Sequence, residues 1–108
     1  MVQQRRTGKL VRDRVPEILR AAGDDPRTAV LSDEEYDLAL QSKLHEEVAK
    51  MVAASDDRCT EELADVLEVL YALAEHHGLD WDTVEHFGLA KRHEMGGFEG
   101  RVWLEPQP

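Results

Sequence analysis

Three acidic side chains, Glu47, Glu62 and Asp65, occupy positions where a helical sequence normally places apolar residues. At about 100° per residue, Glu47 projects into an apolar stripe that consists of Tyr36, Leu40, Leu44, Val48 and Met51. An ionised carboxylate in such a stripe is unfavourable unless a cation or hydrogen bonds compensate its charge. Glu47 therefore requires a partner.

Glu62 lies at the edge of a second apolar face, between Val69 and Leu73 in helical projection. Asp65 follows it at i+3, so both carboxylates can reach one point above the helix. Two facing helices would direct Glu47, Glu62 and Asp65 to the same point, where the three charges would repel one another. A hard divalent cation removes that repulsion, so these residues predict a site for Mg²⁺ or Mn²⁺. Two alternatives stay open: pairing with Arg or Lys from elsewhere, and a helical phase that differs by one residue.

Start and stop signals for helices predict an all-α protein. Pro16 opens a first helix that Gly23 ends, and Ser32 with Glu35 forms a capping box for a second, from Asp33 to about Ala54. A third helix, capped by Ser55, Asp56 or Thr60, continues to His77 before Gly78. A fourth spans 81–95 after a cap at Asp80 or Asp82, and Gly96 with Gly97 ends it. The β-leaning segments 28–31 and 101–104 are expected to be extended and could pair with each other.

The chain of 108 residues predicts one domain, 1–108, because so short a chain closes one modest core. Its apolar content is 42%, and no apolar run approaches the roughly 20 residues that span a bilayer. The formal net charge of −10 disfavours duplex nucleic acid as a partner. Positive charge is concentrated in a basic N-terminal arm, residues 1–14, ahead of an acidic body.

Cysteine and histidine give weaker signals. The single Cys59 cannot form an internal disulfide, which favours a reducing cytoplasm, and no nucleophilic role is expected for it. The five histidines share no metal-ligand spacing, so they are interpreted as surface or packing residues.

Association of two chains is a further expectation. Four short helices leave a thin core, and the apolar arcs of the second and third helices are wider than one partner covers. A homodimer that pairs these helices would cover them. Four large aromatic residues are expected in the core or in subunit contacts: Trp81, Phe87, Phe98 and Trp103.

Four segments in this order, KLVRDRVPEIL, KLHEEVAK, EELADVLEVLYALAEHHG and KRHEMGGFEGRVWL, resemble the all-α nucleotide pyrophosphohydrolases of the MazG-like superfamily. The likeness is greatest to the short subgroup called phosphoribosyl-ATP pyrophosphohydrolase-like, and it extends from Lys9 to Leu104. It implies a four-helix bundle completed by dimerisation. It also implies Mg²⁺-dependent cleavage of a nucleoside triphosphate, or a related nucleotide, to a monophosphate and pyrophosphate, with nucleotide-pool house-cleaning as a possible role.

The metal motif of this superfamily is E-x-x-E on one helix and E-x-x-D on the next. Glu62 and Asp65 match the second pair, and Glu47 matches the first Glu of the first pair. Lys50 stands where the second Glu belongs, and an ammonium cannot bind a cation while it is protonated. Two residues are candidates to replace the missing carboxylate: Glu46, beside the gap, and Glu68, one turn further along the third helix. Glu46 is also a candidate catalytic residue.

The resemblance also implies basic residues that contact phosphates. The candidates are Lys9, Arg12 and Arg14 near the start, and Lys91, Arg92 and Arg101 near the end. Met95 departs from the basic residue that often precedes Gly-Gly-Phe in the subgroup. Trp81 or Trp103 is a candidate to cover the base.

Three functions are therefore weighed. The first is a nucleotide pyrophosphohydrolase with Mg²⁺ held by Glu47, Glu62 and Asp65. The second is a non-catalytic nucleotide-binding or regulatory protein, in which Lys50 replaces the metal and pairs with Glu47 or Glu62. The third is a structural dimerisation module that binds neither metal nor nucleotide, against which the acids on the apolar faces argue.

Overall fold

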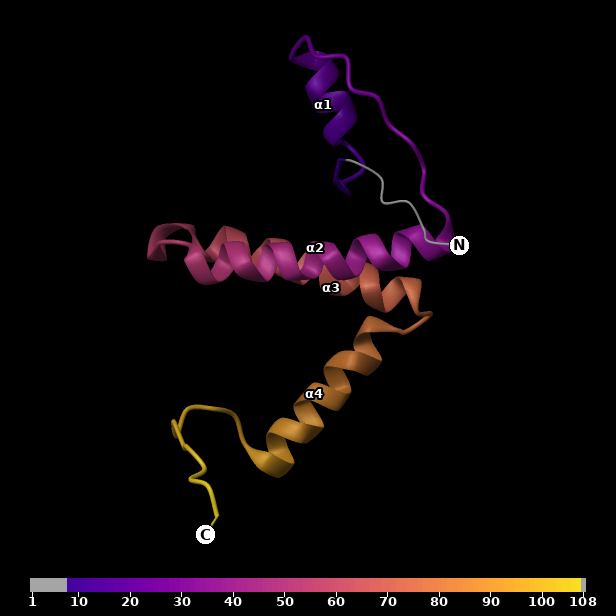
Figure 1. The fold of residues 1–108 in the computed structure, drawn as a ribbon. Helices are drawn as coiled ribbons and strands as arrows, with labels where there is room; N and C mark the ends of the chain where they lie inside the picture. Colours follow the sequence, from indigo (N-terminus) through magenta and orange to yellow (C-terminus); the bar gives the residue numbers. More distant parts are fainter. Residues whose placement is uncertain (1–7, 108) are drawn as a thin grey trace.

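The computed structural model describes residues 8–107 and contains four α-helices and one short 3₁₀ helix (Figure 1). The elements are α1 (Val15–Ala21), α2 (Asp33–Ala53), η1 (Asp56–Arg58), α3 (Cys59–His76) and α4 (Trp81–Met95). The predicted all-α class is confirmed for the described part of the chain. No strand forms between residues 8 and 107, so the pairing suggested for 28–31 and 101–104 is absent, and both segments are irregular. The first seven residues of the basic arm, with Arg5 and Arg6, lie outside the described residues.

Local side-chain chemistry explains where the long second helix begins. The Ser32 Oγ accepts a hydrogen bond from the Glu35 backbone N–H at 3.2 Å, and the Ser32 N–H donates to the Glu35 carboxylate at 3.0 Å. This reciprocal pair satisfies two of the N–H groups that a helix start leaves without partners. The predicted capping box is therefore confirmed, and α2 begins at Asp33 as expected.

The other boundaries agree with the prediction to within a few residues. The chain leaves α3 through Gly78 at φ +70° and leaves α4 through Gly96 at φ +87°, both in the left-handed region that favours glycine. The start of α3 differs from the prediction, because the η1 turn precedes it and no side-chain cap forms there. Asp80 does occupy the N-cap position of α4, but its side chain caps no backbone N–H.

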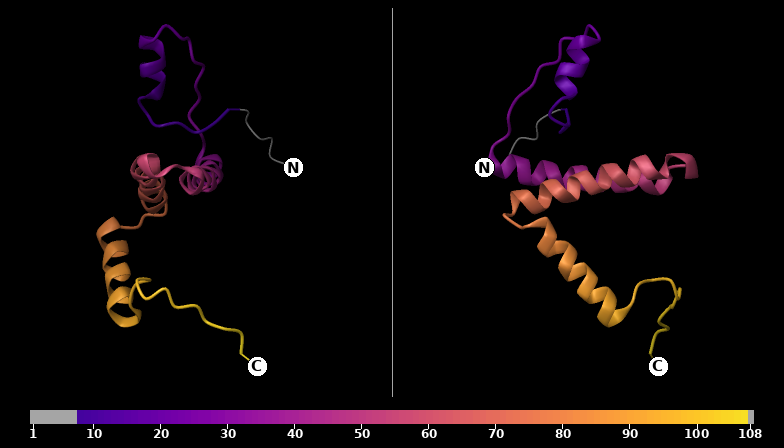
Figure 2. Two further views of the ribbon diagram at one scale, coloured as in Figure 1. Left: turned by 90° about the vertical axis from the view of Figure 1, so that its left-hand side faces the viewer. Right: turned by 180° about the vertical axis from the view of Figure 1, so that it is seen from behind.

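The centre of the molecule is an antiparallel hairpin of α2 and α3, from which α1 and α4 project on opposite sides (Figures 1 and 2). Among the described helices, α1 packs on no other helix, and α4 packs only on α3. The buried apolar side chains in the described region are correspondingly few, namely Leu40, Val69 and Ala74.

This arrangement is more open than a chain of this size normally adopts. The Cα radius of gyration is 18.3 Å, against about 13 Å for a compact 108-residue domain. The accessible surface is 9895 Å², against about 6,100 Å² for a folded monomer of this mass. One chain by itself therefore does not close the four-helix bundle that the resemblance implies.

Candidate metal centre

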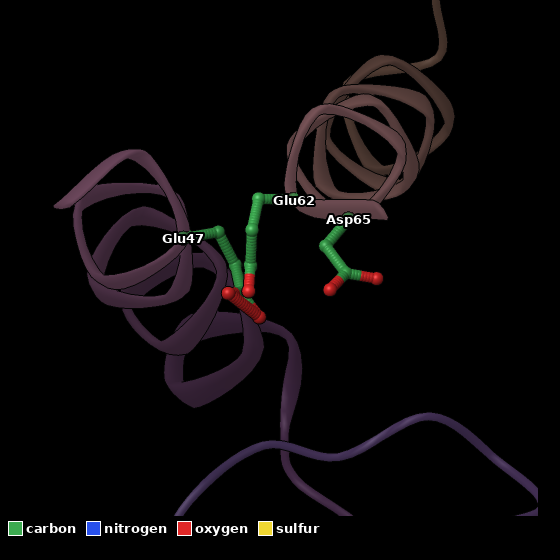
Figure 3. Close-up of side chains that lie close together, drawn as sticks. All are labelled: Glu47, Glu62 and Asp65. Carbon is green, nitrogen blue, oxygen red and sulfur yellow. The ribbon is translucent and has the colours of Figure 1, made fainter. Parts of the chain in front are cut away.

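The three carboxylates singled out by the sequence come together between α2 and α3. Glu47 projects from α2, and Glu62 and Asp65 project from successive turns of α3 (Figure 3). One carboxylate oxygen from each lies within 4.8 Å of the other two. The i,i+3 spacing places both α3 acids on one side of their helix, and the antiparallel packing brings that side opposite Glu47. The predicted convergence is therefore present.

Burial makes this cluster unusual among surface acids. Glu47 is only 5% exposed, and it is the buried charged residue of the described region. The Oε2 atoms of Glu47 and Glu62 are both buried, and neither has a hydrogen-bond partner. A buried carboxylate oxygen without a donor is costly, since desolvation is not repaid. Lys50 lies at ion-pair distance from Glu47 Oε2, whereas Glu62 Oε2 has no ion-pair partner in the described structure, so positive charge is missing on the Glu62 side of the cluster.

Two lysines of α2 flank Glu47 without filling that centre. The Lys43 Nζ lies 3.6 Å from Glu47 Oε1, and the Lys50 Nζ lies 3.5 Å from Glu47 Oε2. Both ammonium groups also approach Glu46, at 3.4 Å and 3.6 Å. These contacts run along one helix, at i+3 and i+4 spacing. Lys50 therefore pairs with Glu47, as the second hypothesis requires, but it forms no ion pair with Glu62 or Asp65 in the described structure.

The charge state of Lys50 follows from these neighbours. The Glu47 carboxylate, assisted by Glu46, raises the pKa of Lys50 above its usual value, outweighing a smaller desolvation effect. Burial opposes ionisation of Glu46, but Lys43 and Lys50 outweigh it and hold the pKa of Glu46 below its usual value. At neutral pH Lys50 is therefore a cation and Glu46 an ionised carboxylate.

Arginines approach the α3 side of the cluster. The Arg12 Nη2 donates a hydrogen bond to Asp65 Oδ1 at 2.8 Å, which joins the segment before α1 to α3. The Arg58 guanidinium of η1 lies 3.9 Å from Glu62 Oε1 and 3.5 Å from the exposed Glu61. Of the predicted phosphate-binding residues, Arg12 is the one that the structure places at the carboxylates.

The other candidates lie elsewhere. Glu46 is outside the group of three converging carboxylates, and Glu68 is exposed on α3. Arg14 pairs with Glu17 at 3.0 Å, and Arg92 pairs with Glu99 at 2.9 Å. The remaining three candidates are exposed side chains, on the N-terminal segment, on α4 and in the C-terminal segment: Lys9, Lys91 and Arg101.

The four large aromatic residues differ in their surroundings: one packs against another ring, and three are exposed. Trp81 packs edge-on against Tyr71, with ring centroids 4.5 Å apart, beside the α3–α4 connection. An open pocket of about 530 Å³ lies there, away from the carboxylates, lined by Tyr71, Ala74, Glu75, Gly78, Leu79, Asp80 and Trp81. Three of the four aromatic residues lie outside the core of the single chain, at 67–97% exposure, so for them the alternative expectation of subunit contacts stays a prediction: Phe87, Phe98 and Trp103.

One polar cluster was missed by the sequence analysis. The Nε2 atoms of His76 and His77, at the end of α3, lie 3.6 Å and 3.4 Å from Asp37 Oδ1 on α2. His76 also packs edge-on against Tyr36, with centroids 5.1 Å apart, which agrees with a packing role. The partner lies on another helix, so no spacing within α3 could have indicated it.

Comparison with known proteins adds one partial likeness. No protein-family model matches the chain, and no solved structure matches it significantly. A protein of uncharacterised function from Mycolicibacterium smegmatis is 56% identical over 46 residues, which cover 43% of this chain and 47% of that protein. The chain thus matches about half the length of this relative. None of the helices between residues 8 and 107 is long and apolar enough to span a bilayer.

Proposed function

We propose that the protein is a nucleotide pyrophosphohydrolase that depends on a divalent cation, Mg²⁺ or Mn²⁺, held by Glu47, Glu62 and Asp65. The observation that supports this proposal is the convergence of these carboxylates within 4.8 Å, with a buried Glu62 Oε2 that has no hydrogen-bond or ion-pair partner in the described structure. They are the residues at which the resemblance to the MazG-like superfamily places metal ligands.

The donor set fits such a cation. All three residues offer hard carboxylate oxygens, which Mg²⁺ and Mn²⁺ prefer over nitrogen or sulfur ligands. Octahedral Mg²⁺ holds its ligands at about 2.1 Å, so opposite ligands are about 4.2 Å apart. The observed spread needs only small side-chain rotations, and Asp65, whose side chain is 40% exposed, has room to make them when its ion pair with Arg12 opens. Three protein ligands leave positions for water and for phosphate oxygens.

The cation would supply the charge stabilisation and the water activation that cleavage of a phosphoanhydride bond requires. The chain's own residues would then position the nucleotide. Arg12 lies at Asp65 and presents a guanidinium suited to phosphate oxygens. Lys50, half exposed at the rim, adds an ammonium on the α2 side. The substrate expected for such a site is a nucleoside triphosphate or a related nucleotide, cleaved to a monophosphate and pyrophosphate.

A second copy of the chain is part of this proposal. The accessible surface exceeds that of a compact monomer by more than a third, and large apolar side chains of all four helices are exposed. A homodimer in which α1 and α4 pack on the partner's α2 and α3 would cover these faces. Within one chain, Lys91, Arg92 and Arg101 do not reach the cluster. The homodimer would bring these residues of one chain towards the cluster of the other.

The runner-up is a non-catalytic nucleotide-binding or regulatory protein in which Lys50 replaces the metal. The observation that favours it is the ion pair of Lys50 with Glu47 at 3.5 Å. Against it, Lys50 forms no ion pair with Glu62 or Asp65 in the described structure, so two of the three carboxylates stay uncompensated by this lysine.

The test is release of pyrophosphate from ordinary and damaged nucleoside triphosphates with Mg²⁺. Glu62→Gln should reduce the rate at least about a hundredfold, because loss of a ligand weakens metal binding and charge stabilisation together. Glu61→Gln is the matched control, since Glu61 is the exposed neighbour on the same helix and should keep the wild-type rate. Activity that survives Glu62→Gln would contradict the assigned centre. Nucleotide binding without turnover, and without metal binding, would favour the runner-up.

A further inference from the structure

Of the cations in the described part of the chain, Arg12 makes the shortest contact with the carboxylate cluster. Its Nη2 lies 2.8 Å from Asp65 Oδ1, whereas the contacts of Lys43, Lys50 and Arg58 with the cluster are 3.5 Å or longer. Arg12 is also 53 residues away from its partner in the sequence. Among residues 8–107, it is the cation that reaches the cluster from outside the α2–η1–α3 unit.

The helix that follows Arg12 has little support from packing on other helices. The α1 helix has seven residues and packs on no other helix of the described structure. A helix shorter than about 12 residues is marginal in water without tertiary contacts. Its apolar residues Ile18 and Leu19 are 59% and 37% exposed. The Arg12–Asp65 ion pair is therefore a substantial link between residues 8–21 and the helical hairpin.

A divalent cation at the cluster and Arg12 on Asp65 compete for the same negative charge. The guanidinium and the cation would lie a few ångströms apart and repel each other. Asp65 gains a hard, doubly charged partner when the cation binds, and this outweighs a half-exposed ion pair of modest strength. Lys43 and Lys50 differ, because they contact Glu47 from the same helix and can turn to solvent without moving the backbone.

We propose that Arg12 sets the affinity of the carboxylate cluster for divalent cations. It neutralises Asp65 when the cluster holds no ion, and an entering cation displaces it and releases residues 8–21 from α3. The freed guanidinium is then available to a phosphate group that the cation draws in. This inference rests on the proposed metal site and adds the residue that tunes it.

Calorimetric titration of the full chain with Mg²⁺ alone tests the competition. Arg12→Gln should bind Mg²⁺ about threefold to tenfold more tightly than the wild type, since the competing ion pair and the repulsion are both removed. Arg20→Gln removes the same charge from the same segment, and its side chain contacts the Pro26 carbonyl instead of the cluster. This control should bind within about twofold of the wild type, because screened charges at a distance contribute little.

Hydrogen exchange of the backbone amides reports the release directly. Mg²⁺ should accelerate exchange in residues 15–22 of the wild type, and Arg12→Gln should exchange fast with or without Mg²⁺. Equal Mg²⁺ affinity of wild type and Arg12→Gln would overturn the inference and leave the metal site standing, because Asp65 would then serve both partners with its two oxygens. Failure of every variant to bind Mg²⁺ would instead remove the metal site, and this inference with it.

Discussion

The carboxylates of Glu47 on α2 and Glu62 on α3 point towards each other, and each keeps a buried Oε2 atom without a hydrogen-bond donor (Figure 3). Lys43 and Lys50 offset the repulsion on the Glu47 side, at 3.6 Å and 3.5 Å, but the burial of Glu62 Oε2 is not compensated in the described structure and is unfavourable without a metal. Asp65 adds a third carboxylate beside Glu47 and Glu62. The helical hairpin is stable only if other contacts outweigh this repulsion, so a cation-binding role gives a physical reason for retaining the three acids.

Lys50 distinguishes the two leading functions. Replacing it in Lys50→Glu removes the ammonium beside Glu47 and adds a fourth carboxylate, so Mg²⁺ affinity should rise at least about tenfold. Calorimetry with Mg²⁺ and with Mn²⁺ measures the change. Arg27→Glu makes the same charge change in the exposed connector between α1 and α2 and should leave the affinity within about twofold of the wild type. No gain for Lys50→Glu would show that position 50 does not face the bound ion.

The exposed face of α4 provides a test of dimerisation. Phe87 is 67% exposed in the single chain, and burial of a Phe side chain contributes about 1.5–3 kcal/mol. Phe87→Asp should therefore weaken the homodimer by about tenfold or more in its dissociation constant, measured by sedimentation equilibrium. His86→Asp alters an exposed neighbour on the same helix and should leave association largely unchanged. A wild-type protein that sediments as a monomer at all concentrations would contradict the dimer.

Tyr36 predicts how stability depends on alkaline pH. Burial, reinforced by Glu75 and Asp13, raises the pKa of Tyr36 above its ordinary value of 10.0. The unfolded chain then loses this proton at a lower pH than the folded chain. The contribution of Tyr36 is therefore fully present below about pH 10 and is lost as pH rises through the folded-state pKa.

Urea unfolding on either side of about pH 10 measures this effect. The wild type should lose more free energy of unfolding across that interval than Tyr36→Phe, which has no phenolic proton to lose. Tyr71→Phe serves as the aromatic control and should keep the wild-type pH dependence. An identical pH dependence for wild type and Tyr36→Phe would contradict the assignment.

Most helix boundaries could be read from local sequence. The capping box of Ser32 and Glu35 and the positive φ angles of Gly78 and Gly96 involve residues close together in the chain. The start of α3 could not be read in the same way, because η1 intervenes without a side-chain cap. Capping boxes and glycine helix ends can be recognised in the sequence because they depend on backbone hydrogen bonds within one turn, which the neighbouring residues largely control.

The periodicity of the sequence by itself determined that Glu47 faces an apolar interior and that Glu62 and Asp65 share one side of a helix. Only the tertiary structure decided which distant cation approaches them, namely Arg12, which lies 53 residues away from Asp65 in the sequence. It also decided that α1 and α4 stand away from the hairpin and that Asp37 meets two histidines. The physical reason is range, because helical phase is set within a few residues, whereas ion pairs and packing between helices depend on how distant segments meet.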